Sequence, residues 1–329
     1  MTSVLDSLWQ LNSKVGDYTR PAAEQSRLDA LAQLDASFWS PSERILINST
    51  KLCIIGEHGK PFLWRSASPK GQTICGWDCY RRATMLEPLL AEVLRDGVPG
   101  DVVEAGVYKG GISIALAAML HARGELGEEH GRRRLYLADS FAGLPPSKEY
   151  SHAFKKERGS EHGAEPAHSV SYMAAGWATG HFRGSQLSVV ANFARCMPST
   201  RDAAPAHARD VPTTSSEESV LPIGVHMVPG FFNESLPGPL ATRRIALLRA
   251  DGDLYASIFE TLVALYPLLS DGGYVVFDDW KFGPSRGAIG DYRQLHNVSS
   301  PIMTSSRDAA APFRTLDRMA FWQKSPVTH

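Results

Sequence analysis

Residues 245–279 read IALLRADGDLYASIFETLVALYPLLSDGGYVVFDD and contain two short apolar runs that each end in acid. The first run precedes Asp251, and the second precedes Asp278 and Asp279. Continuous apolar runs of this length predict strands that are buried on both faces of a parallel sheet. The acids then lie at the carboxyl ends of the strands, where open α/β sheets bind their ligands.

Three carboxylates at one edge repel one another, so either some are protonated or a cation holds them together. Oxygen ligands favour a hard divalent ion, and we predict Mg²⁺ bound by Asp251, Asp278 and Asp279. Asp251 is also placed to take a proton from a substrate hydroxyl. Asp253 competes with Asp251 for this position, because both lie past the strand end. The alternative is that Asp253 caps a helix and that Asp278 and Asp279 are solvated.

The segment DVVEAGVYKGG (residues 101–111) reads as a strand followed by a glycine-rich turn. Its pattern is G-x-x-x-G-G, not the dinucleotide fingerprint G-x-G-x-x-G, and Tyr108 stands in place of the middle glycine. A pyrophosphate has less room there, whereas S-adenosylmethionine has no phosphate, and Glu104 suits its cationic methionine end. A tight turn without a ligand is the alternative. The turn glycines are Gly106, Gly110 and Gly111.

Two further segments predict cofactor contacts. Asp139 ends the second strand in LYLADSFAGLPP, where an acid typically accepts hydrogen bonds from ribose hydroxyls. A helix N-cap formed by Asp139 or Ser140 is compatible with this role. An aromatic residue after the third strand is expected to stack on adenine, with core packing as the alternative. The residues expected at the cofactor in these segments are Asp139, Ser140, Phe141, Gly230, Phe231 and Phe232.

The order of predicted elements indicates an α/β chain with a helical beginning. We expect residues 1–95 to form a mostly helical N-terminal extension or lid and 96–329 to form the main domain. The β-turn-α-β pattern from residue 101 onward begins a doubly wound sheet. Residues 147–220 are a long insertion, and 198–219, rich in Ser, Thr, Ala and Pro, are predicted to be disordered.

Composition excludes several classes of protein. The 329 residues carry 34 basic and 35 acidic side chains, so there is no basic excess to indicate nucleic-acid binding. No apolar run approaches 18 residues and no secretory signal begins the chain, so we expect a cytoplasmic protein without membrane spans.

The four cysteines predict buried small residues in a reduced compartment, not a disulfide framework. Cys75 and Cys79 could share a metal ion, but no matching pair follows at ligand spacing.

These residues resemble the macrocin O-methyltransferase family of metal-dependent sugar O-methyltransferases. The similar segments are DGVPGDVVEAGVYKGG, LYLADSFAGLP, VPGFFNESLP, LRADGDLYASIFETLVALYPLLSDGGYVVFDD and DYRQLH, in the family's order between residues 96 and 296. Tyr108 and Lys109 depart from the family's Trp and Arg. The segments that would bind the acceptor match worst, which puts a macrolide or aminocoumarin sugar in doubt as the substrate.

The resemblance implies a Rossmann-like class I methyltransferase fold, with a mostly parallel seven-stranded sheet and an antiparallel terminal hairpin. It implies S-adenosylmethionine as methyl donor, Mg²⁺ on Asp251, Asp278 and Asp279, and Asp251 as general base. It also implies a small-molecule hydroxyl acceptor and makes a homo-oligomer plausible. A catechol-type methyltransferase and a non-catalytic scaffold are the alternatives; a NAD dehydrogenase lacks its fingerprint.

Overall fold

The computed structural model describes residues 22–55, 74–75, 77–146, 178–197, 221–280, 283–304 and 319–325. Its longer helices are α2 (Ala22–Phe38), α3 (Pro41–Ile55), α4 (Trp77–Arg95), α5 (Gly111–Ala122), α8 (Gln186–Cys196), α10 (Tyr255–Leu265) and α11 (Gly283–Leu295). A short helix is α9 (Phe232–Ser235). The strands are β1 (Asp101–Ala105), β2 (Leu135–Asp139), β3 (Val225–Pro229), β4 (Ile245–Ala250), β5 (Leu269–Phe277), β6 (Met303–Thr304) and β7 (Ala320–Gln323).

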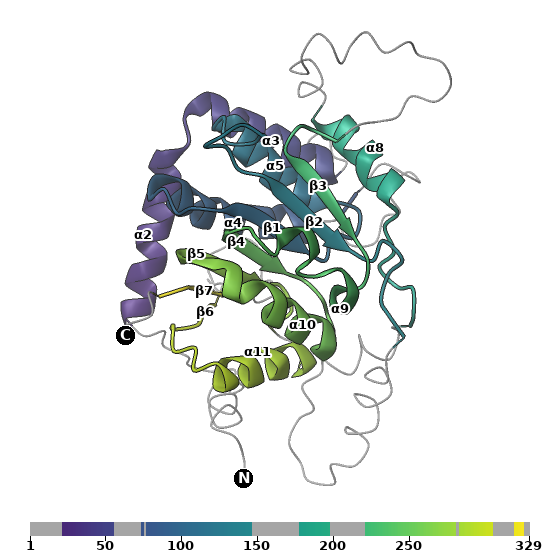
Figure 1. Ribbon diagram of the computed structural model, residues 1–329. Helices are drawn as coiled ribbons and strands as arrows, with labels where there is room; N and C mark the ends of the chain where they lie inside the picture. The colour runs from purple at the N-terminus through teal and green to yellow at the C-terminus, as the bar shows by residue number, and fades with distance from the viewer. Residues whose placement is uncertain are drawn as a thin grey trace, which may run out of the picture.

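The strands form one seven-stranded sheet in the order β3-β2-β1-β4-β5-β7-β6. The first five strands of this order are parallel, and β7 is antiparallel to both β5 and β6. Helices cover both faces of the sheet, with α3, α4 and α5 on one side and α10 and α11 on the other (Figure 1). The predicted Rossmann-like class I fold, with its antiparallel terminal strands, is confirmed.

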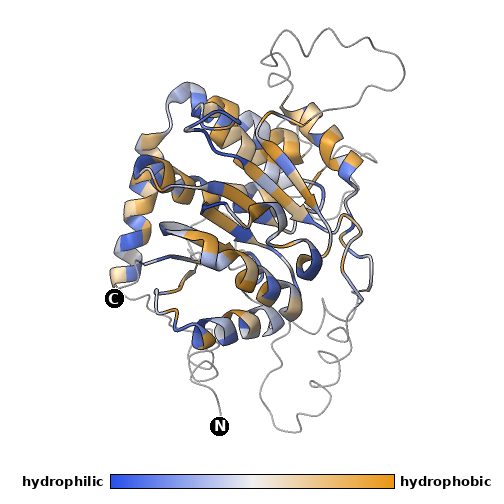
Figure 2. Ribbon diagram, viewed as in Figure 1, coloured by the Kyte–Doolittle hydropathy of each residue, from blue (hydrophilic) through white to orange (hydrophobic). Residues whose placement is uncertain are grey.

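Alternation along each strand divides the core between two faces. Val102 packs with the face covered by α4 and α5, whereas its neighbour Val103 packs with the face covered by α10 and α11. Leu247 and Leu248 divide in the same way. Because successive side chains of a strand point to opposite faces, both must be apolar in a sheet covered twice. The strands are accordingly coloured mainly as hydrophobic in Figure 2.

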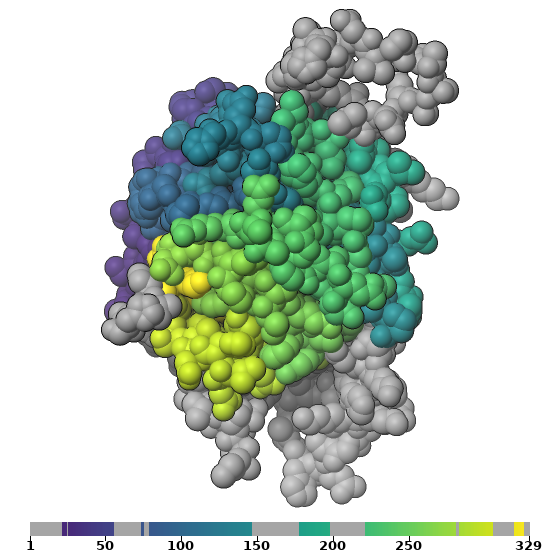
Figure 3. All heavy atoms as spheres, viewed as in Figure 1, coloured from purple at the N-terminus to yellow at the C-terminus, as the bar shows by residue number. Residues whose placement is uncertain are grey.

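The N-terminal helices pack against the helical layer, and α4 joins them to the sheet. Lys51 of α3 is buried and donates to the buried carboxylate of Glu87 on α4. Arg27 of α2 and Tyr274 of β5 both bond to Glu92 of α4. In Figure 3 the atoms of α2 and α3, in purple, adjoin the blue atoms of the segments that follow. The described residues of this region are mostly helical, while its separation as a domain or lid stays a prediction.

The insertion predicted at 147–220 is described only in part. Residues 178–197 contain α8, and residues 198–219, for which disorder is predicted, lie outside the described residues. Asn192 of α8 donates to the carbonyl oxygen of Lys109 at 3.0 Å, so this helix supports the glycine turn. Among the described residues, no helix is both long and apolar enough to cross a membrane.

The cysteine prediction was wrong. Cys53 of α3 is bonded to Cys196 of α8, and Cys75 is bonded to Cys79, so the described residues hold no free thiol. The first pair is 143 residues apart in sequence and meets only because α3 packs against α8, with the two Cα atoms 5.6 Å apart. The cysteines therefore give no support to the expected reduced compartment.

The two disulfides are expected to contribute unequally to stability. A cross-link between distant residues removes more entropy from the unfolded chain than a local one, about 5 against about 2 kcal/mol in the chain-entropy estimate. The double variant Cys53→Ser/Cys196→Ser should therefore lose more free energy of unfolding than Cys75→Ser/Cys79→Ser. Denaturant titration without reductant measures both. Alkylation of all four thiols in the native, unreduced protein would contradict the pairing itself.

Candidate active site

The register of three parallel strands assembles the predicted acids. Ala105 at the end of β1 pairs with Ala250 of β4, which pairs with Phe277 of β5. The next residue in each strand is therefore Gly106, Asp251 or Asp278, and the three positions lie side by side at one edge of the sheet. Two sequence segments that read separately as strands ending in acid thus end side by side, while their role as a binding site stays a prediction.

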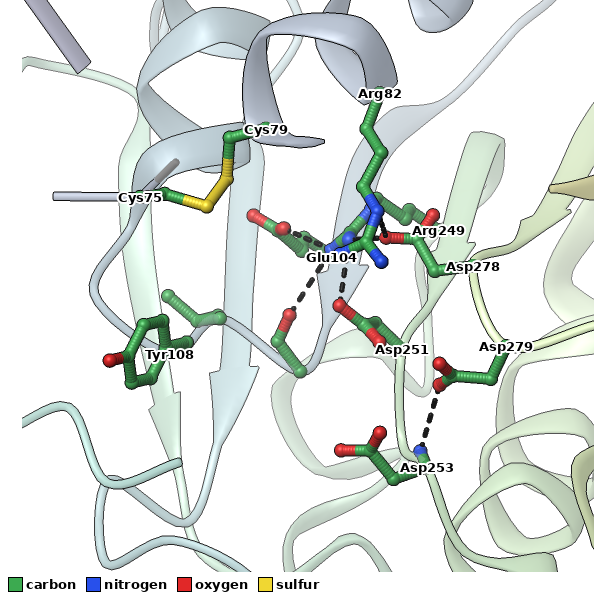
Figure 4. A network of polar contacts seen from close by, with 12 residues as sticks. Cys75, Cys79, Arg82, Glu104, Tyr108, Arg249, Asp251, Asp253, Asp278 and Asp279 are labelled. Carbon is green, nitrogen blue, oxygen red and sulfur yellow. Dashed lines mark hydrogen bonds and ion pairs between the residues drawn. A yellow bond between two sulfur atoms is a disulfide. The ribbon is translucent and has the colours of Figure 1, made fainter. Parts of the chain in front are cut away.

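Arg249 occupies the centre of this edge (Figure 4). Its side chain is buried and forms ion pairs with Glu104 of β1, Asp251 and Asp278. Alternation explains the grouping, because Glu104 and Arg249 pair across β1 and β4 and project toward the same face. One guanidinium thus connects the acid before the glycine turn with the predicted metal ligands.

A trio of acids meets at the same edge, and Asp251 belongs both to this trio and to the ion pairs of Arg249. Carboxylate oxygens of Asp251, Asp253 and Asp279 lie within 4.8 Å of one another. The backbone N–H of Asp253 donates to Asp279 Oδ2 at 3.1 Å, and Asp253 adopts a left-handed backbone with φ of 59°. A left-handed conformation is uncommon outside glycine, although Asp tolerates it better than most residues.

The electrostatics of the four acids differ. Burial and the neighbouring carboxylates raise the pKa values of Asp253 and Asp279 well above the usual range. Burial also acts to raise the pKa of Asp251, but Arg249 and Arg82 outweigh it and hold that pKa below its ordinary value. Burial leaves the pKa of Asp278 raised despite the two arginines. When ionised, the carboxylates of the trio repel one another, and a bound cation would relieve that repulsion.

The glycine turn directly contacts the acid edge, the end of the sheet that carries Asp251, Asp253, Asp278 and Asp279. A Cβ atom at Gly106 would lie 1.8 Å from the carbonyl oxygen of Asp251, so only glycine fits this close approach. Gly106 has a φ of 96°, in the region that glycine tolerates. The backbone N–H of Asp251 also donates to Ala105 O at 2.8 Å. A ligand bound at the turn would consequently lie beside the acids.

Asp139 holds the glycine turn in place. Its Oδ2 accepts from the backbone N–H groups of Val107 at 2.7 Å and Tyr108 at 3.0 Å, while its Oδ1 accepts from Phe141 at 2.7 Å. Burial raises its pKa, although these three hydrogen bonds oppose the shift. The structure places Asp139 at the predicted edge and shows a scaffolding role; contact with a ribose stays a prediction.

The remaining predicted cofactor residues surround Asp139. Gly230 donates its backbone N–H to Asp139 O at 3.0 Å, which brings the turn after β3 alongside. Ser140 Oγ donates to Gly143 O, and the Phe141 ring is buried. Phe232 packs against the apolar core, and Phe231 beside it is half-buried.

The profile of the macrocin O-methyltransferase (TylF) family matches residues 67–175 and 214–314. The chain belongs to this family. A relative from Streptomyces olivaceus, 8-demethyl-8-(2,3-dimethoxy-alpha-L-rhamnosyl)-tetracenomycin-C 4'-O-methyltransferase, is 35% identical over 223 residues, which are 68% of this chain and 69% of the relative. The mycinamicin III 3''-O-methyltransferase of Micromonospora griseorubida is 30% identical over 228 residues, 69% of this chain and 73% of the relative.

Among solved structures, the O-methyltransferase NovP aligns with a TM-score of 0.56 over 86% of this chain and 99% of its own, at 24% identity. This likeness supports the fold. With the family established, the chain is an S-adenosylmethionine-dependent O-methyltransferase, as the sequence predicts.

Two functional candidates of this macrocin O-methyltransferase family member were missed by sequence reasoning. Arg249 and Arg82 both form ion pairs with Asp278. Arg249 had a visible signal, because an arginine inside a fully buried strand run needs carboxylate partners. Arg82 had no such signal in the sequence, since only the packing of α4 brings it to β5. Asp253, which competes with Asp251 in the sequence, lies beside it in the acid trio.

Burial raises the pKa of Glu104 to about 7, although Arg249 and a hydrogen bond from Ser113 oppose the shift. A carboxyl with a raised folded pKa contributes stability that is present below its unfolded pKa near 4.5 and lost as pH rises through 7. Without Mg²⁺ and cofactor, wild type should therefore lose on the order of 3 kcal/mol from this group between pH 4.5 and 8. Glu104→Gln should lack this component.

Denaturant unfolding of both proteins at pH 5 and 8 measures the difference. The other acids titrate in both proteins, so they cancel in the comparison. Equal pH dependence in wild type and Glu104→Gln would show that Arg249 keeps Glu104 ionised throughout.

Proposed function

We propose that this enzyme transfers the methyl group of S-adenosylmethionine to a hydroxyl of a sugar carried by a small metabolite, with Mg²⁺ at the acid edge. The sugar acceptor rests on the relatives, whose names specify a rhamnosyl tetracenomycin and mycinamicin III. The observation that carries the chemistry is the contact between the glycine turn at Gly106 and the backbone of Asp251. It supports the proposal that the methyl donor binds beside the acid cluster at one sheet edge.

The cofactor is proposed to lie over the glycine turn, between the loops after β2 and β3. Asp139 fixes the turn by accepting a hydrogen bond from Val107, and Gly230 holds the loop after β3 beside Asp139. Tyr108 lies within the turn, is partly exposed and has a φ of 53°. The carboxylate of Glu104 is already engaged by Arg249 and Ser113, so it would act on the methionine end chiefly through its charge.

The donor set fits a hard divalent cation. Asp251, Asp253 and Asp279 offer only oxygen atoms, all within 4.8 Å of one another, and their mutual repulsion needs a counter-charge. Asp251 and Asp279 belong both to this trio and to the set predicted from sequence, and we propose them as ligands. Within the described residues, the buried Oδ1 of Asp278 has no hydrogen-bond partner, which keeps Asp278 a candidate beside Asp253.

Bound Mg²⁺ would lower the pKa of a coordinated acceptor hydroxyl. Asp251 is proposed to accept the hydroxyl proton, since Arg249 keeps its carboxylate ionised and oriented by a 2.7 Å hydrogen bond. Asp253, whose pKa is raised, is the rival base. The half-buried position of Asp251 leaves it accessible to an acceptor, whereas Asp278 is fully buried.

Calorimetry tests the binding of the proposed cofactor and of the proposed metal ion in one experiment. S-adenosylmethionine is titrated into wild type and into Asp278→Ala/Asp279→Ala, and Mg²⁺ is then titrated into each complex. We expect both proteins to bind the cofactor and wild type alone to bind Mg²⁺. Absence of cofactor binding by folded wild type would overturn the enzymatic proposal, and binding of Mg²⁺ by the double variant would remove the metal site from this edge.

Single variants identify the third ligand. If the geometry of the trio holds with metal, Asp253→Asn should weaken Mg²⁺ binding more than Asp278→Asn does; the reverse would support the set predicted from sequence. An acceptor panel of rhamnosides and catechols, followed by S-adenosylhomocysteine formation, tests the substrate class. Methylation of catechols alone would replace the sugar proposal with the catechol-type alternative.

A further inference from the structure

Arg82 is a charged side chain near the acid edge that the proposed mechanism does not use. It belongs to α4, outside the strand-turn segments that build the site, yet its Nε lies 3.3 Å from Asp278 Oδ2. Figure 4 shows it descending from its helix toward Arg249, Asp251 and Asp278. Its side chain is 24% exposed, whereas that of Arg249 is 2% exposed.

Asp278 Oδ2 is shared by two guanidinium groups. Arg249 donates to it from within the sheet, and Arg82 approaches it from the helical layer above. Arg249 Nη2 is in turn divided between Asp278 and Asp251, where its distance to Oδ2 is 2.7 Å. Loss of Arg82 would leave Arg249 alone to neutralise a fully buried carboxylate, and would draw it away from Asp251.

The helix that carries Arg82 is fixed at several points. Three residues earlier, Cys79 is bonded to Cys75 beside Gly111, and further along the helix Glu87 and Glu92 are held by Lys51 and Arg27. Arg82 therefore reaches the site from a rigid support, which suits a residue that must hold another group in one place.

From these contacts we propose that Arg82 is a positioning residue that holds Asp278 and limits the affinity of the acid edge for a divalent cation. The inference rests on the proposed function for its metal. Five acids meet here, Glu104, Asp251, Asp253, Asp278 and Asp279, against two arginines, Arg249 and Arg82. Removing one of the two positive charges strengthens the attraction for a cation, because like charges within several ångströms oppose its binding.

The test titrates Mg²⁺ into the S-adenosylhomocysteine complexes of wild type, Arg82→Gln, Arg82→Lys and Arg95→Gln. Arg82→Gln should bind Mg²⁺ about tenfold more tightly, as expected for loss of one nearby positive charge at intermediate dielectric. Arg82→Lys keeps the charge and should stay within about twofold of wild type. Arg95→Gln makes the same change on the same helix at an exposed position 13 residues later, and should bind as wild type.

Turnover should move in the opposite direction. With Arg249 drawn from Asp251, kcat of Arg82→Gln should fall about tenfold on the glycoside found by the acceptor panel, while its KM for S-adenosylmethionine stays unchanged. Tighter metal binding with slower turnover is a combination that a loosened fold does not give. Arg82→Met is a second neutral variant, in case glutamine disturbs folding.

Unchanged or weaker Mg²⁺ binding by folded Arg82→Gln and Arg82→Met would overturn the inference. Failure of wild type to bind Mg²⁺ at all would instead overturn the proposed metal site, so the two failures are distinguishable.

Discussion

Replacing Asp251 with asparagine is expected to lower turnover by about 10³-fold, within the range that a positioned general base contributes. The asparagine would retain the size of the side chain but accept no proton and carry no charge for a metal. Since the glycine turn contacts the backbone of residue 251 and not its carboxylate, cofactor affinity should change little. Single-turnover methylation and calorimetry with S-adenosylhomocysteine measure the two properties separately.

Two variants sharpen this prediction. Asp271→Asn makes the same substitution at an exposed position of β5 and should behave as wild type. Asp253→Asn tests the rival base, and a larger loss of turnover there than at Asp251→Asn would transfer the role to Asp253. Normal activity of Asp251→Asn would exclude Asp251 as the base.

Arg249→Met is expected to cost about 3–5 kcal/mol of stability, because it leaves buried carboxylates without their counter-charge. Glu104 and Asp278 are almost completely buried, and Arg249 pairs with both. For a chain of this size such a loss lowers the melting temperature by about 4–7 °C. Thermal unfolding near pH 7, without Mg²⁺, measures the effect.

The control for this variant is Arg132→Met. Arg132 forms an ion pair with Glu129 in which both side chains are largely exposed, and such pairs contribute about 0–1 kcal/mol. Lowering the pH should partly restore Arg249→Met, because protonated carboxyls no longer need the guanidinium. A melting temperature equal to that of wild type would show that the acids already share protons in the absence of metal.

Much of the site could be predicted because it lies where apolar runs end. Asp251 and Asp278 follow strands with continuous apolar sequence, and parallel neighbours bring such ends to one edge. The different contacts of Asp278 and Asp279 could not be predicted in this way. They are adjacent in sequence, so they point to opposite faces: Asp278 meets Arg249 and Arg82 under α4, whereas Asp279 meets Asp253.

The disulfide bonds could not be predicted from the sequence either. A separation of 143 residues gives no indication of a bond between Cys53 and Cys196. That contact depends on how α3 and α8 pack against α5, which is a property of the assembled helical layer.

The sequence by itself determined the order of strands and helices, the sheet edge that carries the chemistry and the membership of the O-methyltransferase family. These features depend on local periodicity and on residues at strand ends, which a linear pattern records. The tertiary structure decided the partners: Arg82 from α4 on Asp278, Asp253 beside Asp279, and the paired cysteines. Partners are set by strand register and helix packing, which join residues that the linear sequence keeps far apart.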